Sequence, residues 1–188
     1  LKDALLASRP IRHNVVECGV FQGATAILLG TYLQEQDLLE PDKKFLLFDS
    51  FEGLSEPDPD LDGEAFRQGD FAAGLQSVKD RLGSFKFVEY WKGWIPDRFE
   101  ENADRRFSFV HIDVDLYQPV RDCLEFFYPG LAAGGAIVLD DYGQEACPGA
   151  KRAADEYVHA QGSTVLWVPT GQGLILKRNN RHQYMRQP

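Results

Sequence analysis

Four aspartates end two apolar segments of strand length, and their spacing is suited to metal or acid–base chemistry. Asp113 and Asp115 close the segment 109–117, and Asp140 and Asp141 close the segment 136–142. Continuous apolar runs of this length predict buried parallel strands. Ligands of an open α/β sheet bind outside the carboxyl ends of its strands, so we expect the four carboxylates to converge there.

Four carboxylates in one crevice repel each other and raise one another's pKa unless a positive charge lies among them. A divalent cation is the simplest partner, and carboxylate oxygens suit Mg²⁺, Mn²⁺ or Ca²⁺ better than Zn²⁺. Residues two apart on a strand face the same way, so one of Asp113 and Asp115 can bind a metal while the other moves a proton. His111 lies within an apolar run, and we interpret it as a core histidine rather than a ligand.

A glycine-containing turn follows the first predicted strand, 14–20. The pattern Glu17-x-Gly19-x-x-x-Gly23 leads into a helical apolar pattern that continues from Ala26. Glycines at a strand-to-helix turn let backbone N–H groups approach a ligand closely. The pattern lacks the Gly-x-Gly-x-x-Gly spacing of most dinucleotide sites, and a tight turn without a ligand is the alternative.

An acid at the next strand end adds to this interpretation. The second predicted strand, 44–48, is followed by Asp49-Ser50-Phe51. An acid at this position can accept hydrogen bonds from ribose hydroxyls, which favours a nucleoside site. A turn cap is the alternative role for Asp49 or Ser50.

The segment 55–70 is acidic, and we interpret it as a solvated lid loop near the site. Asp58-x-Asp60-x-Asp62-Gly63 imitates the start of a calcium loop, but the twelfth position is Gly69 rather than Glu. Calcium binding is therefore the weaker alternative.

A helix over 71–82 and a third strand over 85–90 are expected next. Gly93 and Trp94 then lie at the correct end of the sheet to contact an adenine, although the tryptophans of this segment can equally pack beneath the lid.

The remaining segments predict a short helix over 96–103, a turn bracketed by Pro129-Gly130 and Gly134-Gly135, and a helix over 150–161. Strands over 164–169 and 173–178 form a terminal hairpin, and the tail 179–188 is polar and expected to be loosely held. This order predicts an α/β fold: a doubly wound, seven-stranded, mostly parallel sheet with a C-terminal antiparallel hairpin.

The composition fits one globular domain, 1–188, with its core at about 14–178. The chain has 188 residues, 44% of them hydrophobic, and a net charge of −9, which argues against binding to nucleic acid or to an anionic membrane and favours a small-molecule partner. Three cysteines, two in apolar runs, favour reduced thiols and a cytoplasmic location. No apolar stretch has membrane-spanning length, and because the chain starts at Leu1 we expect a missing amino-terminal segment.

The combined motifs resemble those of class I S-adenosylmethionine-dependent methyltransferases, and more specifically the macrocin O-methyltransferase family. The residues that carry the resemblance are 48–54, 113–117 and 140–143, and it extends over about 14–178. It implies a Rossmann-like sheet and a magnesium-dependent enzyme that methylates sugar hydroxyls of macrolide and aminocoumarin antibiotics. The family usually has an amino-terminal extension that helps to cover the substrate and supports oligomers, so a homo-oligomer is an open alternative here.

The resemblance also implies residue roles. Asp113, Asp140 and Asp141 match metal ligands, and Asp115 matches the general base, with Asp113 as the alternative base. The expected cofactor-binding set is Glu17, Gly19, Val20, Phe21, Gly23, Thr25, Asp49, Ser50, Phe51, Gly93, Trp94 and Asp113. A metal would lower the pKa of an acceptor hydroxyl, and the base would then take its proton.

Other functions remain open at this point. In a metal-dependent glycosyltransferase, Asp-x-Asp after a strand would hold a nucleotide-sugar diphosphate, but this role does not explain the segment 17–23. A phosphatase would place Asp-x-Asp on its first strand rather than the fourth. A non-catalytic nucleotide-binding module would have no need for four aspartates together. Within methyltransferases, a catechol-type acceptor is the alternative to a sugar.

Overall fold

A computed structural model describes residues 1–8 and 11–178 of the chain, and the expected polar tail lies outside these residues. A seven-stranded sheet has the order β3-β2-β1-β4-β5-β7-β6. The strands are β1 (Asn14–Cys18), β2 (Phe45–Asp49), β3 (Val88–Lys92), β4 (Phe107–Ile112), β5 (Leu131–Leu139), β6 (Leu166–Trp167) and β7 (Gly173–Leu176). β1 to β5 pair in parallel, whereas β7 is antiparallel to both β5 and β6. The prediction of a mostly parallel α/β sheet with a C-terminal antiparallel hairpin is confirmed.

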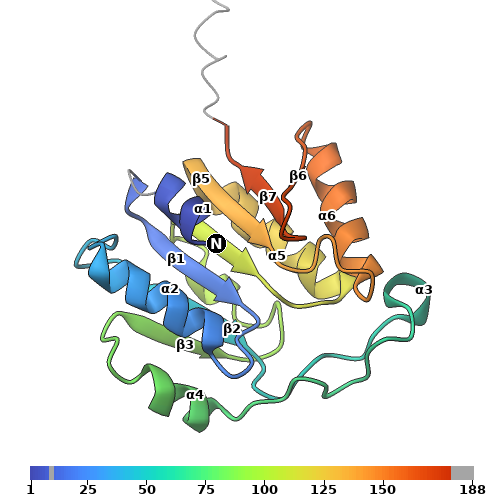
Figure 1. Cartoon of the computed structure of the whole chain (residues 1–188), viewed down its shortest axis with the longest axis horizontal. Helices are drawn as coiled ribbons and strands as arrows, with labels where there is room; N and C mark the ends of the chain where they lie inside the picture. Colours follow the sequence, from blue (N-terminus) through green and yellow to red (C-terminus); the bar gives the residue numbers. More distant parts are fainter. Residues whose placement is uncertain (9–10, 179–188) are drawn as a thin grey trace, which may run out of the picture.

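Helices cover both faces of this sheet (Figure 1). They are α1 (Lys2–Ala7), α2 (Ala24–Glu35), α3 (Pro59–Asp62), α4 (Leu75–Leu82), α5 (Tyr117–Gly130) and α6 (Pro148–Ala160), with a 3₁₀ turn at Glu100–Asn102. Buried side chains of α2 and α4, such as Leu29 and Val78, share one core cluster with Val15 of β1. Buried side chains of α5, such as Phe127, share the other with Val16. The sheet is therefore the middle of three layers.

Strand alternation decides which polar residues are enclosed. Val15 and Val16 belong to opposite clusters, so Glu17 faces the α2 side of the sheet. His111 is the register partner of Glu17 on β4, and the same alternation puts it on the same face. All five residues of β1 are buried. A carboxylate and an imidazole are thus enclosed next to each other near the carboxyl ends of two central strands.

Several boundaries differ from the predictions for local physical reasons. β5 begins at Leu131, so the expected turn around Gly134 lies inside the strand. Leu131 pairs with Phe107 while Ala136 pairs with Phe109, and this irregular stretch contains Gly134 at a φ of 84°. The glycines therefore form an irregularity within a strand rather than a connection before it.

Three further predictions need adjustment in the connections. The predicted helix 71–82 starts only at Leu75, and Phe71 lines a cavity instead. The predicted helix 96–103 is reduced to the 3₁₀ turn, and the lid segment contains the short helix α3. Within the described residues, no helix is long and apolar enough to cross a membrane.

The backbone ladder carries the aspartates to one edge of the sheet. The Asp113 amide donates to the Cys18 carbonyl at 2.9 Å, and the Asp140 amide donates to the Ile112 carbonyl at 2.9 Å. β1 and β4 approach so closely here that a Cβ at Gly19 would overlap the carbonyl oxygen of Asp113. Glycine at this position is therefore required by packing as well as by the turn.

Candidate active site

A cavity of about 280 Å³ lies at the carboxyl ends of the central strands. Six of the expected cofactor-binding residues line it: Gly19, Phe21, Asp49, Ser50, Trp94 and Asp113. Asp115, the expected base, lines it as well. The turn after β1, the acid after β2 and the carboxylates after β4 therefore share one hollow, as the sequence predicts.

The other six expected cofactor residues lie outside this lining, and their contact with a cofactor remains a prediction. They are Glu17, Val20, Gly23, Thr25, Phe51 and Gly93. Glu17 is buried beneath the turn, with 1% of its surface exposed. Gly23 is the left-handed N-cap of α2, with a φ of 82°. Two of these positions therefore have structural roles in shaping the site.

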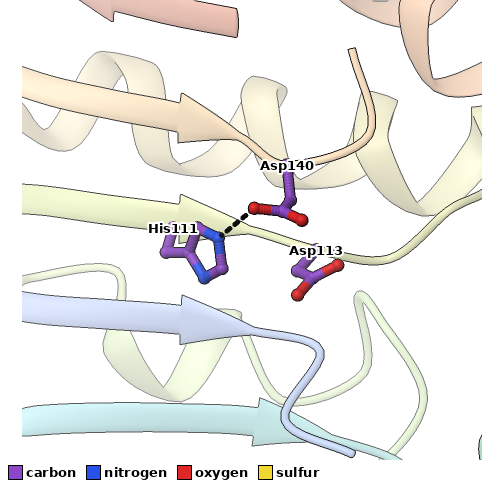
Figure 2. A group of neighbouring side chains, drawn as sticks. All are labelled: His111, Asp113 and Asp140. Atoms are coloured by element: carbon purple, nitrogen blue, oxygen red, sulfur yellow. Dashed lines mark hydrogen bonds and ion pairs between the residues drawn. The ribbon is translucent and has the colours of Figure 1, made fainter. Parts of the chain in front are cut away.

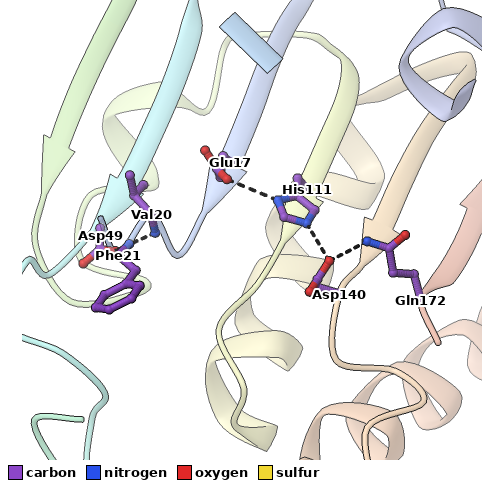
Figure 3. Close-up of polar contacts among 7 residues, drawn as sticks. All are labelled: Glu17, Val20, Phe21, Asp49, His111, Asp140 and Gln172. Atoms are coloured by element: carbon purple, nitrogen blue, oxygen red, sulfur yellow. Dashed lines mark hydrogen bonds and ion pairs between the residues drawn. The ribbon is translucent and has the colours of Figure 1, made fainter. Parts of the chain in front are cut away.

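Asp49 fixes the turn that forms one wall (Figure 3). Its Oδ2 accepts the amides of Val20 at 2.6 Å and Phe21 at 3.1 Å, and its Oδ1 accepts the Phe51 amide at 2.5 Å. Phe21 and Phe51 have φ values of 46° and 57°, a region that side-chain-bearing residues seldom adopt. The three hydrogen bonds hold this strained backbone, so Asp49 acts as a turn cap while it still borders the cavity.

Trp91 lies in β3 and Trp94 follows that strand, and their environments differ. Trp94 lines the cavity, whereas Trp91 stacks on Phe48 with ring centroids 6.0 Å apart. Sequence reasoning missed seven lining residues: Gly53, Leu54, Ser55, Phe71, Ile95, Val114 and Pro119. Six of them come from connections whose path has no periodic signal in the sequence, and Pro119 lies in the first turn of α5.

The four aspartates converge at the sheet edge but form two groups. Asp113 and Asp140 lie with His111, their possible ligand atoms all within 4.8 Å of one another (Figure 2). Asp115 and Asp141 lie with Cys147 under the same limit. The expected metal set of Asp113, Asp140 and Asp141 is therefore divided between two neighbouring groups. Asp141 Oδ2 accepts the Asp115 amide at 3.1 Å, which links the second group to the loop after β4.

His111 is buried, as expected, but it lies between two carboxylates (Figure 3). Its Nδ1 is 3.3 Å from Glu17 Oε1, and its Nε2 is 3.3 Å from Asp140 Oδ1. Gln172, just before β7, donates to the same Asp140 oxygen at 2.5 Å. A hydrogen-bonded chain thus runs from β1 through β4 and β5 to the residue before β7. The sequence signal for this role of His111 was strand alternation, which puts His111 on the same face as Asp113.

The charge on His111 follows from this environment. Burial by itself would lower the pKa of His111, but the hydrogen bonds to Asp140 and Glu17 outweigh it and raise the pKa to about 10. The hydrogen bond from His111, helped by Gln172, lowers the pKa of Asp140. His111 is therefore an imidazolium at neutral pH, and it supplies a positive charge that we had expected from a metal alone.

The remaining carboxyls have raised pKa values. Burial and the neighbouring acids Asp141, Asp140 and Asp115 raise the pKa of Asp113 to about 8, against the opposing effect of His111. Burial and the charge of Asp115 raise the pKa of Asp141 to about 7. Burial also raises the pKa of Asp115. One imidazolium therefore does not offset the neighbouring acids, and the raised pKa values mean that Asp113 and Asp141 retain protons near neutral pH.

The available donor atoms fit a hard divalent cation. Both nitrogens of His111 face carboxylates, and burial raises the pKa of the Cys147 thiol further above neutrality. A metal would therefore meet carboxylate oxygens only, which suits Mg²⁺, Mn²⁺ or Ca²⁺ rather than Zn²⁺. For a cofactor, Glu17 Oε2 is a buried acceptor with no hydrogen-bond partner among the described residues.

Comparison with solved structures identifies the class of fold. The O-methyltransferase NovP superposes with a TM-score of 0.81 at 23% identity, covering 95% of this chain and 78% of that chain. The calicheamicin methyltransferase CalS11 superposes with a TM-score of 0.76 at 21% identity, covering 93% and 76%. The sheet and its helices therefore have the Rossmann-like fold of these methyltransferases.

Comparison of sequences identifies the family. The family described as macrocin O-methyltransferase (TylF) matches residues 4–166, and the chain belongs to this family. A demethyldecarbamoylnovobiocin O-methyltransferase from Streptomyces niveus is 30% identical over 156 residues, which are 77% of this chain and 57% of that protein. An 8-demethyl-8-(2,3-dimethoxy-alpha-L-rhamnosyl)-tetracenomycin-C 4'-O-methyltransferase from Streptomyces olivaceus is 27% identical over 174 residues, covering 84% and 66%. The chain thus spans about six tenths of the length of these curated relatives.

Proposed function

We propose that this protein transfers a methyl group from S-adenosylmethionine to a hydroxyl group of a small natural-product acceptor. One observation carries the proposal: the glycine turn after β1 and the carboxylates Asp113 and Asp115 line the same cavity. The expected cofactor-binding turn and the expected acid–base groups share one cavity, and this supports the proposal. Family membership supports the same activity.

The turn side of the cavity is the proposed cofactor side. Gly19 and Asp49 line it, and Trp94 adds an aromatic surface that can contact the adenine. The unpartnered oxygen of Glu17 supports this assignment, because a buried acceptor without a donor costs free energy until a bound molecule or water supplies one. This wall also includes Ser50 and Phe21.

Asp113 and Asp140 are the proposed core of a divalent cation site, with Asp141 from the neighbouring group as the further expected ligand. When bound, such a cation lowers the pKa of a coordinated hydroxyl. His111 and Gln172 occupy Asp140 Oδ1, which leaves Oδ2 of that carboxylate as its available oxygen. These two partners thereby hold the carboxylate in one orientation.

Asp115 is the proposed general base. It lines the cavity, and its backbone has a φ of 59°, held by the hydrogen bond from its amide to Asp141. A carboxylate whose pKa is raised by burial accepts a proton from a hydroxyl more readily than an exposed one, and general base catalysis contributes about 10²- to 10⁴-fold. The cavity would also align the two substrates, an effect worth about 7 to 11 kcal/mol in well-oriented reactions.

A sugar hydroxyl is the proposed acceptor. The names of the relatives include a rhamnosyl-tetracenomycin 4'-O-methyltransferase and a mycinamicin III 3''-O-methyltransferase. A catechol-type acceptor is the second candidate within the same chemistry, because vicinal hydroxyls would serve a carboxylate-bound cation equally well.

The deciding experiment is calorimetric titration of S-adenosylhomocysteine into the protein, once with Mg²⁺ and once with a chelator. We expect the nucleoside to bind in both runs and Mg²⁺ binding to be lost in Asp140→Ala. Methyl transfer is then measured by mass spectrometry on glycosylated acceptors and catechols, with Asp115→Asn expected to bind both ligands but turn over slowly. A folded protein that binds uridine diphosphate instead of S-adenosylhomocysteine would overturn the proposal in favour of glycosyl transfer.

A further inference from the structure

The acidic repeat of the lid segment has a role other than calcium binding. Asp58 Oδ1 accepts the Asp60 amide at 2.9 Å and caps α3. Asp62 Oδ2 accepts the Asp58 amide at 2.9 Å, and Asp62 Oδ1 accepts the Tyr117 amide at 2.7 Å. Asp62 is 95% buried, since only 5% of its surface is exposed. Its carboxylate is directed at backbone amides, one of which lies 55 residues away.

Asp62 caps a helix that has no cap of its own. α5 begins at Tyr117, and its N-cap residue Leu116 makes no side-chain hydrogen bond. A carboxylate at the start of a helix satisfies an unpaired amide and interacts favourably with the helix dipole. α6 approaches from the other side: Gly149 packs so tightly that a Cβ there would overlap Asp62 Oδ1. The lid is thus inserted between the starts of α5 and α6.

This contact links the lid to α5, a helix that contributes to the cavity wall. At its base, the Leu54 amide donates to the Asp70 carbonyl at 2.8 Å and the Gly69 amide donates to the Leu54 carbonyl at 2.9 Å. Figure 1 shows α3, at the far end of the connection from β2, beside the start of α6. The base residue Leu54 lines one wall of the cavity, and Pro119 of α5 lines another. The lid therefore joins two walls of the same hollow.

The lid also returns to the cofactor side. Phe71, the residue that follows the lid segment 55–70, meets Phe21 of the glycine turn edge to face, with ring centroids 5.7 Å apart. Both rings line the cavity. The segment is consequently held at its base, at Phe71 and at Asp62. The hydrogen bond of Asp62 reaches the Tyr117 amide, two residues after Asp115.

We propose that Asp62 is a positioning residue that latches the lid to the start of α5 and so sets the cavity wall and the Asp115 loop for the acceptor. This inference rests on the proposed methyltransferase function, which it deepens by naming what shapes the acceptor side. Asp62 touches no reacting atom in this assignment. It acts through the Tyr117 amide and through the path of the lid.

The first test is hydrogen–deuterium exchange of the whole protein, read by mass spectrometry. Asp62→Ala should accelerate exchange at least about tenfold both in lid peptides and at the Tyr117 amide, because a hydrogen bond to a charged group is lost at each. Asp60→Ala is the matched control, since Asp60 is an exposed acid of the same helix. Unchanged exchange at Tyr117 in a folded Asp62→Ala protein would overturn the latch.

A second variant breaks the latch without removing the acid. Gly149→Ala adds a methyl group against Asp62 Oδ1 and should reproduce the exchange pattern, whereas Gly74→Ala adds one into open space and should not. If Asp62→Ala does not fold, Gly149→Ala decides alone. Wild-type exchange behaviour in Gly149→Ala would then refute the latch.

The positioning role has its own measurement. With an acceptor found by the methyl-transfer screen, both latch variants should raise the acceptor KM far more than the Kd for S-adenosylhomocysteine, while the two controls change neither. Faster exchange with unchanged acceptor kinetics would reduce Asp62 to a structural residue and overturn the positioning proposal. Failure of wild-type protein to bind S-adenosylhomocysteine would instead contradict the proposed function, and the exchange experiment would still decide on the latch.

Discussion

Replacement of His111 by phenylalanine tests the electrostatics of the site most directly. The imidazolium of His111 is fully buried between Glu17 and Asp140, and Glu17 Oε1 has this ring as its partner while Glu17 Oε2 already lacks one. Phenylalanine keeps an aromatic ring but removes both donors. The carboxylate of Glu17 is then enclosed without any compensating charge.

The size of the effect follows from this geometry. Removing one partner of a buried ion pair costs about 3 to 5 kcal/mol of unfolding free energy, because an unpaired charge stays behind. Asp140 contributes less to this cost, since a third of its side chain is exposed and Gln172 still donates to it. We therefore expect His111→Phe to lose about 3 kcal/mol or more, a large part of the 5 to 15 kcal/mol that typical domains possess.

Urea unfolding followed by circular dichroism measures this loss, and the double-mutant cycle with Glu17→Gln assigns it. The neutral amide should make His111→Phe less costly, with a coupling free energy of at least about 1 kcal/mol. His159→Phe on the exposed side of α6 is the control and should change stability by less than about 0.5 kcal/mol. A loss below about 1 kcal/mol, or strictly additive effects of the two substitutions, would show that His111 packs as a neutral residue and refute the reasoning.

Three further predictions concern pH, the metal and the cofactor. The pKa values of Asp113 and Asp141 are raised to about 8 and 7, so the metal-free protein should lose stability as the pH rises from about 4 through these values. Mg²⁺ should restore this stability most above about pH 8, as measured by thermal unfolding with chelator or metal. A melting temperature that rises over this pH range in chelator would contradict the assignment. Gln172→Ala should weaken Mn²⁺ binding about tenfold by electron paramagnetic resonance, because Asp140 loses one of two orienting donors, while Gln76→Ala should not. Asp49→Ala should weaken binding of S-adenosylhomocysteine at least about tenfold in calorimetry, because three turn amides lose their acceptor, and unchanged affinity would show that the turn does not need it.

Much of the fold could be predicted from local sequence signals. Apolar runs with acids after them marked the parallel strands, and the glycines from Gly19 to Gly23 marked the turn into α2. These signals are local because burial on both faces of a sheet requires continuous apolar residues. The antiparallel pairing of β6 and β7 followed from a short turn between two strand-like segments. The irregular start of β5 could not be predicted from local signals, because its pairing with β4 depends on two segments far apart in the chain.

The site, too, could be predicted in part from local signals. The acids Asp113, Asp115, Asp140 and Asp141 could be placed at one edge because parallel strands end on one side of a sheet, and their family could be recognised from the motifs. Their division into two groups depends on side-chain directions in the loops after β4 and β5. Residue types alone do not specify these directions.

Two roles were decided by contacts between distant segments. His111 looks like a core residue in sequence, and it becomes the cation of an acidic cluster only because the register of β1 and β4 puts Glu17 beside it while Asp140 follows β5. Asp62 looks like part of a calcium loop, and it becomes a helix cap only because the lid reaches Tyr117. Local sequence patterns thus specify which chemical groups the strands carry to the edge of the sheet. Which of those groups meet depends on the folded arrangement, because hydrogen bonds and charge interactions act over a few ångströms between residues that can be far apart in the chain.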